Sequence, residues 1–411
     1  MRAMYITWLE MKKALLSPVI LILLLLMLAL NLFLIISNSH HKEELKIVND
    51  IVETYGLAFD DEVLATMEGD LLKSAQQLGG TDTAAFLEAM TYEKYEQANV
   101  SDQKQIDEIS LKFTYLQVAK GLEARYEAID LSKEKEAFLQ QYAMPGWLEK
   151  KMVAEFNDWE SRYDEIVAKN EYKKWFFLSN YRMHSELFRT HMKTLAVEGV
   201  LLVVLLTAFI TNYEFEHRTQ LVIYPTKKGR KLLLNKGLAS LLASFIVLTV
   251  LFGGTLATYF TVYDYSTVWQ ASISSGFNWE YQLPYITWWD LSVGQYFVLA
   301  LGILLVVLII VVLLTYAIAV FVKNSYYTWI IGVLLLMAMF IVPAYFSNSV
   351  ILWLSSFNIS MLLMNPHEYF DGGRMFMETQ YHEVWTLVIW LSIASIAVCW
   401  AIHYFNRKDV M

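Results

Sequence analysis

The chain has 411 residues, of which 56% are hydrophobic and only 18% are charged; soluble domains have about 45–50% and about 25%, so much of this chain must lie away from water. The formal net charge of −9, from 32 Lys and Arg against 41 Asp and Glu, excludes the basic surface that binding to nucleic acid requires. The single cysteine, Cys399, excludes a disulfide within the chain and any metal site built from several cysteines.

The hydrophobic residues are concentrated in six segments. Each can cross about 30 Å of hydrocarbon as a helix, which rises about 1.5 Å per residue and satisfies its own backbone hydrogen bonds. The first segment has a longer apolar run than a signal peptide and no small-residue cleavage motif after it, so we expect a retained anchor. The sequence therefore predicts an all-α membrane protein with six transmembrane helices, at residues 17–36, 194–211, 237–263, 296–322, 327–346 and 384–405.

The long segment between the first two spans, residues 37–193, is hydrophilic and acidic. It contains 19 Lys and Arg against 29 Asp and Glu, so its net charge of −10 accounts for the negative charge of the whole chain. It has a single proline, and its aromatic residues recur at helical rather than alternating spacing. We expect an α-helical extracellular domain, inserted between spans one and two and large enough to bury a modest core.

Local signals predict turns within this domain. A glycine pair at 79–80 indicates one turn, with Thr81 or Thr83 capping the helix that follows, and a Pro-Gly pair at 145–146 indicates another. A last helix over about 171–193 is expected to run directly into the second span, because no helix breaker lies between them.

Lysine and arginine counts in the short loops predict the orientation. Residues 1–16 contain three and residues 212–236 contain six, whereas 264–295 contain none and 347–383 contain one. Because short cytoplasmic loops are enriched in these residues, we expect a plasma-membrane protein with both termini in the cytoplasm, including the tail at 406–411. The segments 264–295 and 347–383 then lie outside.

Motifs for catalysis and metal binding are missing. A Walker A phosphate-binding loop ends in Gly-Lys, and none of the 17 glycines is followed by Lys. The pairs His184/His191 and His367/His382 lack acids at ligand spacing, so we expect these histidines at the surface. We predict a chain that is not an enzyme, with no catalytic residue, no metal site and no cofactor bound to it.

Glu198 is the one acidic residue within the six predicted spans. An acid in a membrane is a functional candidate, because its burial is costly. It lies about one turn from the predicted outer boundary, so contact with headgroups or Lys193 is the competing explanation. A gradient-driven carrier is disfavoured, because it would need paired charges at mid-depth. Asn31 and the glycine pair at 253–254 are interpreted as close helix crossings.

The segment between the second and third spans, residues 212–236, is the most informative. Glu214 and Glu216 follow the second span, a short apolar stretch ends at Pro225, and basic residues lead into the third span. The positive charges alone would keep this loop in the cytoplasm. The two acids and the apolar stretch therefore predict an additional role.

These features resemble the ABC-2 type permease family, the membrane subunits of ABC exporters. Members have a basic amphipathic N-terminal helix, six spans, and a coupling loop with a leading acid, a short helix and a turn before basic residues. The resemblance places a cytoplasmic interfacial helix at residues 1–16, the coupling helix at 219–224, and short re-entrant helices within 347–366. It is strongest with members that have a large extracellular domain after the first span. The chain departs from the family at His217-Arg218, where members often have glycine.

The resemblance implies a role for each part of the loop. Contact with a separate ATPase is expected from Glu214, Glu216, Leu221, Tyr224 and Pro225. Lipid headgroups or acids of the ATPase are expected to meet Lys227, Lys228, Arg230, Lys231 and Lys236. The implied partners are two ABC ATPase subunits that bind ATP and Mg²⁺, a second permease subunit in a homo- or heterodimer, and membrane lipid, with no nucleic acid.

The expected function is that of the permease subunit of an ATP-driven exporter for an amphipathic, peptide- or lipid-like compound such as an antimicrobial. The competing hypothesis is a membrane-anchored sensor or assembly factor whose acidic extracellular domain binds a cationic peptide. The sensor needs no ATPase partner, whereas the exporter does.

Overall fold

The structure is a computed structural model that describes residues 2–178, 185–225, 229–279, 284–372 and 379–407, which form helices and loops without a named strand. Six of the described helices are long and apolar enough to cross a membrane, which confirms the helical class and the six predicted segments. The α-helical parts of these segments are α2 (Pro18–Ser37), α10 (Lys193–Glu216), α12 (Leu232–Val262), α13 (Val293–Val322), α14 (Ser325–Ile341) and α17 (His382–Arg407).

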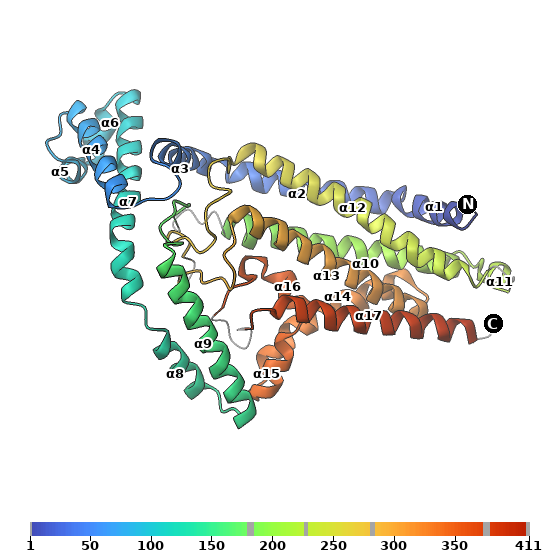
Figure 1. Ribbon diagram of the computed structural model, residues 1–411. Helices are drawn as coiled ribbons and strands as arrows, with labels where there is room; N and C mark the ends of the chain where they lie inside the picture. The colour runs from blue at the N-terminus through green and yellow to red at the C-terminus, as the bar shows by residue number, and fades with distance from the viewer. Residues whose placement is uncertain (1, 179–184, 226–228, 280–283, 373–378, 408–411) are drawn as a thin grey trace.

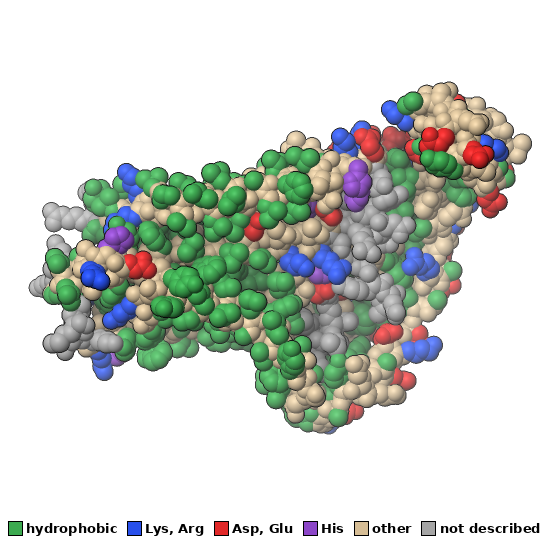
Figure 2. Space-filling model, turned by 180° about the vertical axis from the view of Figure 1, so that it is seen from behind, with side chains coloured by type: hydrophobic (Ala, Val, Ile, Leu, Met, Phe, Trp, Pro, Cys, Tyr) green, Lys and Arg blue, Asp and Glu red, His purple; other side chains and the backbone are tan. Residues whose placement is uncertain are grey.

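Helix α10 is the centre of the bundle. It packs against α2, α12, α13 and α14, while α17 packs on α13 (Figure 1). Helix α10 is apolar on all sides, which is typical of a helix surrounded by protein. Gly199 permits the close packing, because a Cβ atom there would lie 3.0 Å from Leu308 and 3.2 Å from Leu248. The outer helices leave a broad band of hydrophobic side chains on the surface (Figure 2), as expected of a multi-pass membrane protein.

The N-terminal helix α1 (Arg2–Leu15) precedes α2 and packs alongside α12 (Figure 1). Pro18 occupies the first turn of α2, where its missing N–H costs no helical hydrogen bond. The location of α1 at a membrane surface stays a prediction. The glycine pair at 253–254 marks a helix crossing at one of its two positions: a Cβ on Gly254 would lie 3.2 Å from Leu28 of α2, whereas Gly253 faces open space.

The acidic segment is helical, and its helices extend away from the bundle at the end opposite α11 (Figure 1). Helices α4 to α6 pack near the first part of the long helix α7, and α8 pairs with α9. An extracellular location for this segment stays a prediction. The helices are α3 (Lys42–Tyr55), α4 (Asp61–Gln77), α5 (Thr83–Glu88), α6 (Tyr92–Gln97), α7 (Val100–Glu127), α8 (Leu131–Gln141) and α9 (Gly146–Ala168).

Two local predictions for this segment were wrong. The N-cap of α5 is Asp82 rather than Thr81 or Thr83, because the Asp82 carboxylate accepts a hydrogen bond from the Ala85 N–H at 2.9 Å. The helix expected over 171–193 does not start there: α9 ends at Ala168, and Asn170 takes a left-handed conformation with φ 53°. Residues 179–184 lie outside the described residues, and the described part of the helix that leads into the second span begins with the π-helical turns η2 (Ser185–Met192).

The loop between α12 and α13 is part of the same layer as the acidic helices. The Phe277 ring lies 5.5 Å from Tyr115 of α7 and 5.4 Å from Trp175. The Gly276 N–H donates to the Tyr172 carbonyl at 2.9 Å, and a Cβ at Gly276 would lie 2.8 Å from Leu122. This close approach joins the loop to the helical domain.

Two short helices follow α14, as predicted for the segment 347–366. They are α15 (Ser349–Ser356) and α16 (Ile359–Met364). Helix α16 packs against α10, α13, α14 and α17. Helix α15 contacts the acidic domain instead: the Trp353 ring lies 5.7 Å from Trp147, and the Ser349 hydroxyl donates to the Ala143 carbonyl at 2.8 Å. The pair thus links the domain to the bundle.

Candidate functional site

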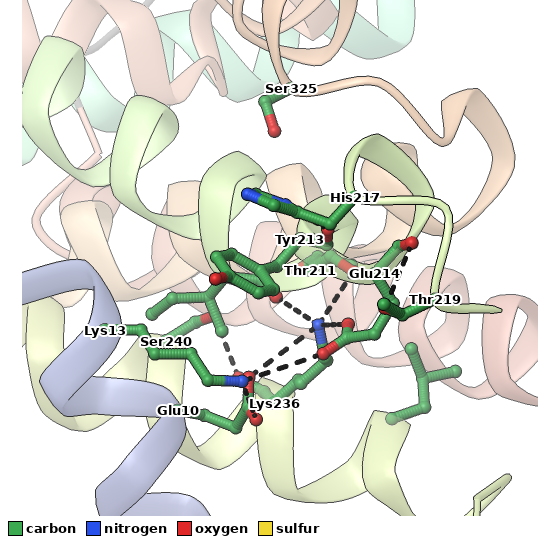
Figure 3. Close-up of polar contacts among 12 residues, drawn as sticks. Glu10, Lys13, Thr211, Tyr213, Glu214, His217, Thr219, Lys236, Ser240 and Ser325 are labelled. Carbon is green, nitrogen blue, oxygen red and sulfur yellow. Dashed lines mark hydrogen bonds and ion pairs between the residues drawn. The ribbon is translucent and has the colours of Figure 1, made fainter. Parts of the chain in front are cut away.

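Lys236 lies buried where α1, α10 and α12 meet (Figure 3). Its ammonium group forms an ion pair with Glu214 and lies 3.8 Å from Glu10 Oε2. It also donates hydrogen bonds to the carbonyl oxygens of Ile210 and Thr211, at 2.5 and 3.3 Å. A buried charge needs such partners, because removing it from water is costly. Lys236 therefore holds α1 and α10 against α12.

Lys13 and Glu10 extend the cluster onto α1. Lys13 Nζ lies 2.7 Å from Glu10 Oε1 and 3.9 Å from Glu214 Oε1, and it stands over the Tyr213 ring at 4.6 Å. Two lysines and two glutamates make a formally neutral group. The mutual pairing allows Glu10 and Glu214 to be buried as ions without an uncompensated charge.

Tyr224 closes the cluster on the side of the loop. Its hydroxyl donates to Glu214 Oε2 at 3.5 Å, and its buried ring lies 5.5 Å from Phe215 and 5.0 Å from Phe405. Burial, together with the nearby charges of Glu214 and Glu10, raises the pKa of the Tyr224 hydroxyl far above its usual value. The hydroxyl therefore stays a hydrogen-bond donor. Tyr224 belongs to an apolar cluster with residues of α12, α13 and α17, namely Leu233, Tyr316, Ala317, Val320 and Ala401.

The short helix α11 (Gln220–Ile223) lies beyond the ends of α10 and α12, at the tip of the molecule (Figure 1). It coincides with the coupling helix expected at 219–224. Its two sides differ: Ile223 packs against the apolar cluster that contains Tyr224, whereas Leu221 and Val222 are 58% and 76% exposed. Pro225 follows at the surface. The helix thus has one side fixed to the bundle and one apolar side in solvent.

Glu216 and Arg218 lie at the turn between α10 and α11, and each has a structural role there. Glu216 Oε1 accepts a hydrogen bond at 2.7 Å from the N–H of Ser325, the first residue of α14, where a negative charge is favoured by the helix dipole. Arg218 has φ 57°, and the Thr219 N–H then reaches the Glu214 carbonyl at 2.9 Å. Glycine adopts this left-handed conformation without a steric penalty, so Arg218 stands at a position that suits glycine.

Replacing Arg218 with Gly is expected to stabilise the protein by up to about 1 kcal/mol, because the left-handed conformation then costs no steric strain. Thermal unfolding of the purified protein in detergent measures the change. His217→Gly is the matched control: His217 has φ −88°, so glycine there should lower the melting temperature. A lower melting temperature for Arg218→Gly would contradict the interpretation.

Burial corrects the roles expected for three of the predicted residues. Glu214 and Tyr224 were expected to form a docking surface and Lys236 to meet headgroups or acids of an ATPase, but all three are buried. Ion pairing and aromatic packing hold them inside the bundle, so their contacts are internal. Of the residues expected to dock, the structure leaves Leu221, Pro225 and Glu216 at the surface.

The predicted basic residues of the loop do not form one group. Lys231 is exposed, whereas Arg230 is partly buried and donates to the Asn406 carbonyl at the end of α17. Lys227 and Lys228 lie outside the described residues.

Sequence reasoning missed Glu10 and Lys13. The available signal was the position of Glu10 between Thr7 and Ala14, because these three residues form a buried stripe at spacings of three and four on α1. An acid on the buried side of a helix predicts a buried cation as its partner. The sequence pattern of α1 does not predict that this cation comes from α12.

The structure does not show the contact with Lys193 that was one competing explanation for Glu198. Its carboxylate accepts a hydrogen bond from the Asn31 side chain of α2 at 2.6 Å, rather than pairing with Lys193. Three histidines expected at the surface, His191, His367 and His382, are buried. His184 lies outside the described residues.

In the part of the chain that the structure describes, no group of three or more His, Cys, Asp or Glu is arranged to hold a metal ion. Comparisons with protein-family models, curated proteins and solved structures found no match to this chain. Function therefore has to be argued from the geometry of the site.

Proposed function

We propose that this chain is the membrane subunit of an ATP-driven exporter, and that α11 is its contact with a separate ATPase. The observation that supports this most is the division of α11 into two sides. Leu221 and Val222 are exposed at the tip of the bundle, while Tyr224 is buried and the partly buried Ile223 packs against the same apolar cluster.

The internal contacts of α11 reach most of the bundle. Tyr224 touches residues of α10 and α17 directly, and its apolar cluster includes α12 and α13. Glu214 connects the same point to Lys236 of α12 and Lys13 of α1. Packed interiors respond to a displacement by moving whole elements. A displacement of α11 by a bound partner is therefore transmitted to five helices.

The exposed side of α11 suits a protein partner. In the sequence, the two neighbouring apolar side chains lie between the exposed, charged Arg218 and Lys231. Interfaces typically combine an apolar centre with a polar rim. The sequence has no Gly-Lys pair for a Walker A loop, so the energy of ATP would have to come from another chain. The positive charge of the adjoining loops supports a cytoplasmic location for this end.

The same proposal assigns the remaining parts. The acidic helical domain lies outside the cell, both termini lie inside, and two such membrane subunits work with two ATPase chains. The transported compound is amphipathic, either peptide-like or lipid-like, because it would have to move between apolar helices and a polar surface.

The double substitution Leu221→Asp and Val222→Asp tests the contact. The tagged chain is purified from its native membranes in mild detergent, and both the amount of any Walker A ATPase chain and the ATP hydrolysis of the eluate are measured. Wild type is expected to retain an ATPase in fixed ratio. The double variant should lose at least about 10-fold of it, because a charge at the centre of an interface costs about 2 kcal/mol or more.

Tyr92→Asp is the matched control. Tyr92 is 77% exposed on α6, far from α11, so this variant should retain as much ATPase as wild type. Retention of the ATPase by the α11 double variant would disprove the contact. A wild-type preparation with no ATPase chain and no ATP hydrolysis would disprove the exporter and favour the sensor.

A further inference from the structure

Asn31 and Glu198 form an isolated polar pair inside the apolar part of the bundle. Asn31 is 0% and Glu198 5% exposed, and the Asn31 amide donates to Glu198 Oε2 at 2.6 Å. On α2, Asn31 lies in a buried stripe whose other members are apolar: Ile20, Leu24, Met27 and Ile35. It precedes the end of α2 by six residues, about 9 Å along the helix.

Each partner of the pair has one further oxygen atom that is buried and without a hydrogen bond to any described residue. These atoms are Glu198 Oε1 and Asn31 Oδ1. Both are acceptors if the carboxyl group is ionised, and then neither can satisfy the other. If Oε1 carries a proton, it becomes a donor and the Asn31 oxygen becomes its acceptor.

The charged groups of the surrounding helices leave Glu198 without a cation. Helices α2 and α13 contain no charged residue, and the only one in α12 is Lys236. Lys236 binds Ile210, twelve residues and about 18 Å along α10 from Glu198. On the outer side, Lys193 begins α10 five residues earlier, and no ion pair joins it to Glu198. An ionised Glu198 would therefore be a buried charge with a single hydrogen bond, which is a costly state.

We propose that Glu198 is a buried proton-binding site, in which the neutral carboxylic acid and the Asn31 amide form two reciprocal hydrogen bonds that join α2 to α10. The amide N–H donates to Oε2, and the acid O–H on Oε1 donates to Oδ1. The arrangement satisfies both unpartnered oxygens at once and removes the charge. Its ligand is a proton, and it does not depend on the proposed exporter function.

This site is a polar connection between α2 and α10 that is separate from the cluster of Glu10, Lys13 and Glu214, which joins α1 to α10 at the opposite end of α10. Unlike that cluster, the Asn31–Glu198 pair contains no cation, so loss of the proton would leave a negative charge between α2 and α10. The contact between the first span and the central helix is therefore strongest while the proton is bound.

Infrared spectroscopy of the purified full chain, with no partner or ligand added, tests the proposal. At about pH 8 exposed carboxyl groups are ionised, so a remaining carboxylic-acid carbonyl band reports buried neutral acids. We expect this band in wild type and a loss of about one group's intensity in Glu198→Gln. Glutamine can form the same two hydrogen bonds with Asn31 without a titratable proton, so the melting temperature of this variant should be unchanged at about pH 6 and should exceed that of wild type at alkaline pH.

Glu216→Gln is the matched control on the same helix. Glu216 is exposed, so its replacement should remove carboxylate absorption and leave the carboxylic-acid band intact. Loss of carboxylate absorption in Glu198→Gln would show an ionised Glu198 and overturn the proposal. So would a wild-type spectrum with no carboxylic-acid band at about pH 8, a measurement that needs no variant to fold.

Discussion

Replacing Lys236 with Met is expected to destabilise the protein by about 3–5 kcal/mol, the cost of leaving a buried charge without its partner. Methionine has nearly the length of lysine but no charge. Lys13 would then be the one cation left to pair with both Glu214 and Glu10, so one buried negative charge would be uncompensated. The hydrogen bond at 2.5 Å to the Ile210 carbonyl would also be lost. Thermal unfolding in detergent, followed by intrinsic tryptophan fluorescence, measures the loss.

Lys231→Met is the control for this change. Lys231 is exposed and lies five residues before Lys236, so its replacement should alter stability by no more than about 0.5 kcal/mol. Adding Glu214→Gln to Lys236→Met removes one uncompensated charge and should recover part of the stability. If Lys236→Met has the same melting temperature as wild type, or if the double variant is no more stable than the single one, the ion cluster does not hold these helices together.

The second large effect is expected at Arg162, within the acidic domain. Its guanidinium group forms two hydrogen bonds with Glu171, at 2.8 and 2.6 Å, and its Nε donates to the Thr287 carbonyl at 2.9 Å. All three residues are buried. Burial works against the charged form, but the hydrogen bonds and charge of Glu171 raise the pKa of Arg162, so the guanidinium group stays charged.

Arg162→Met should therefore cost about 3–5 kcal/mol as well, because Glu171 would remain buried without a cation. The substitution also disconnects α9 from the loop between α12 and α13, to which Thr287 belongs. Limited proteolysis should cut this domain faster in the variant, while the thermal transition shifts to lower temperature.

Two further variants separate charge from geometry at this position. Arg162→Lys keeps the charge but cannot reach both Glu171 oxygens and the Thr287 carbonyl together, so an intermediate stability is expected. Lys169→Met removes a surface pair with Glu165, which should matter by less than about 1 kcal/mol. Equal stability of Arg162→Met and Lys169→Met would show that the buried pair has no structural role.

The loop between α10 and α12 shows which features a local sequence pattern can predict and which it cannot. The short helix expected at 219–224 is present as α11, just before Pro225. The pattern could not tell which side chains of that stretch face inward. Helix α11 is only one turn long, so its orientation depends on where Phe405 and Tyr316 lie, and these come from spans that end almost one hundred residues later or more.

Hydropathy, spacing and breakers determined the helical class, the six apolar segments and the acidic segment, because each depends on the local cost of exposing apolar groups or bending the backbone. The two short helices after α14 were expected only from the family resemblance. Only the tertiary structure decided the partners of the polar residues inside. Glu198 pairs with Asn31 across 167 positions, and Lys236 with Glu214 and Glu10 on two other helices. A buried charge requires a partner wherever packing brings one within reach, and sequence distance has no part in that requirement.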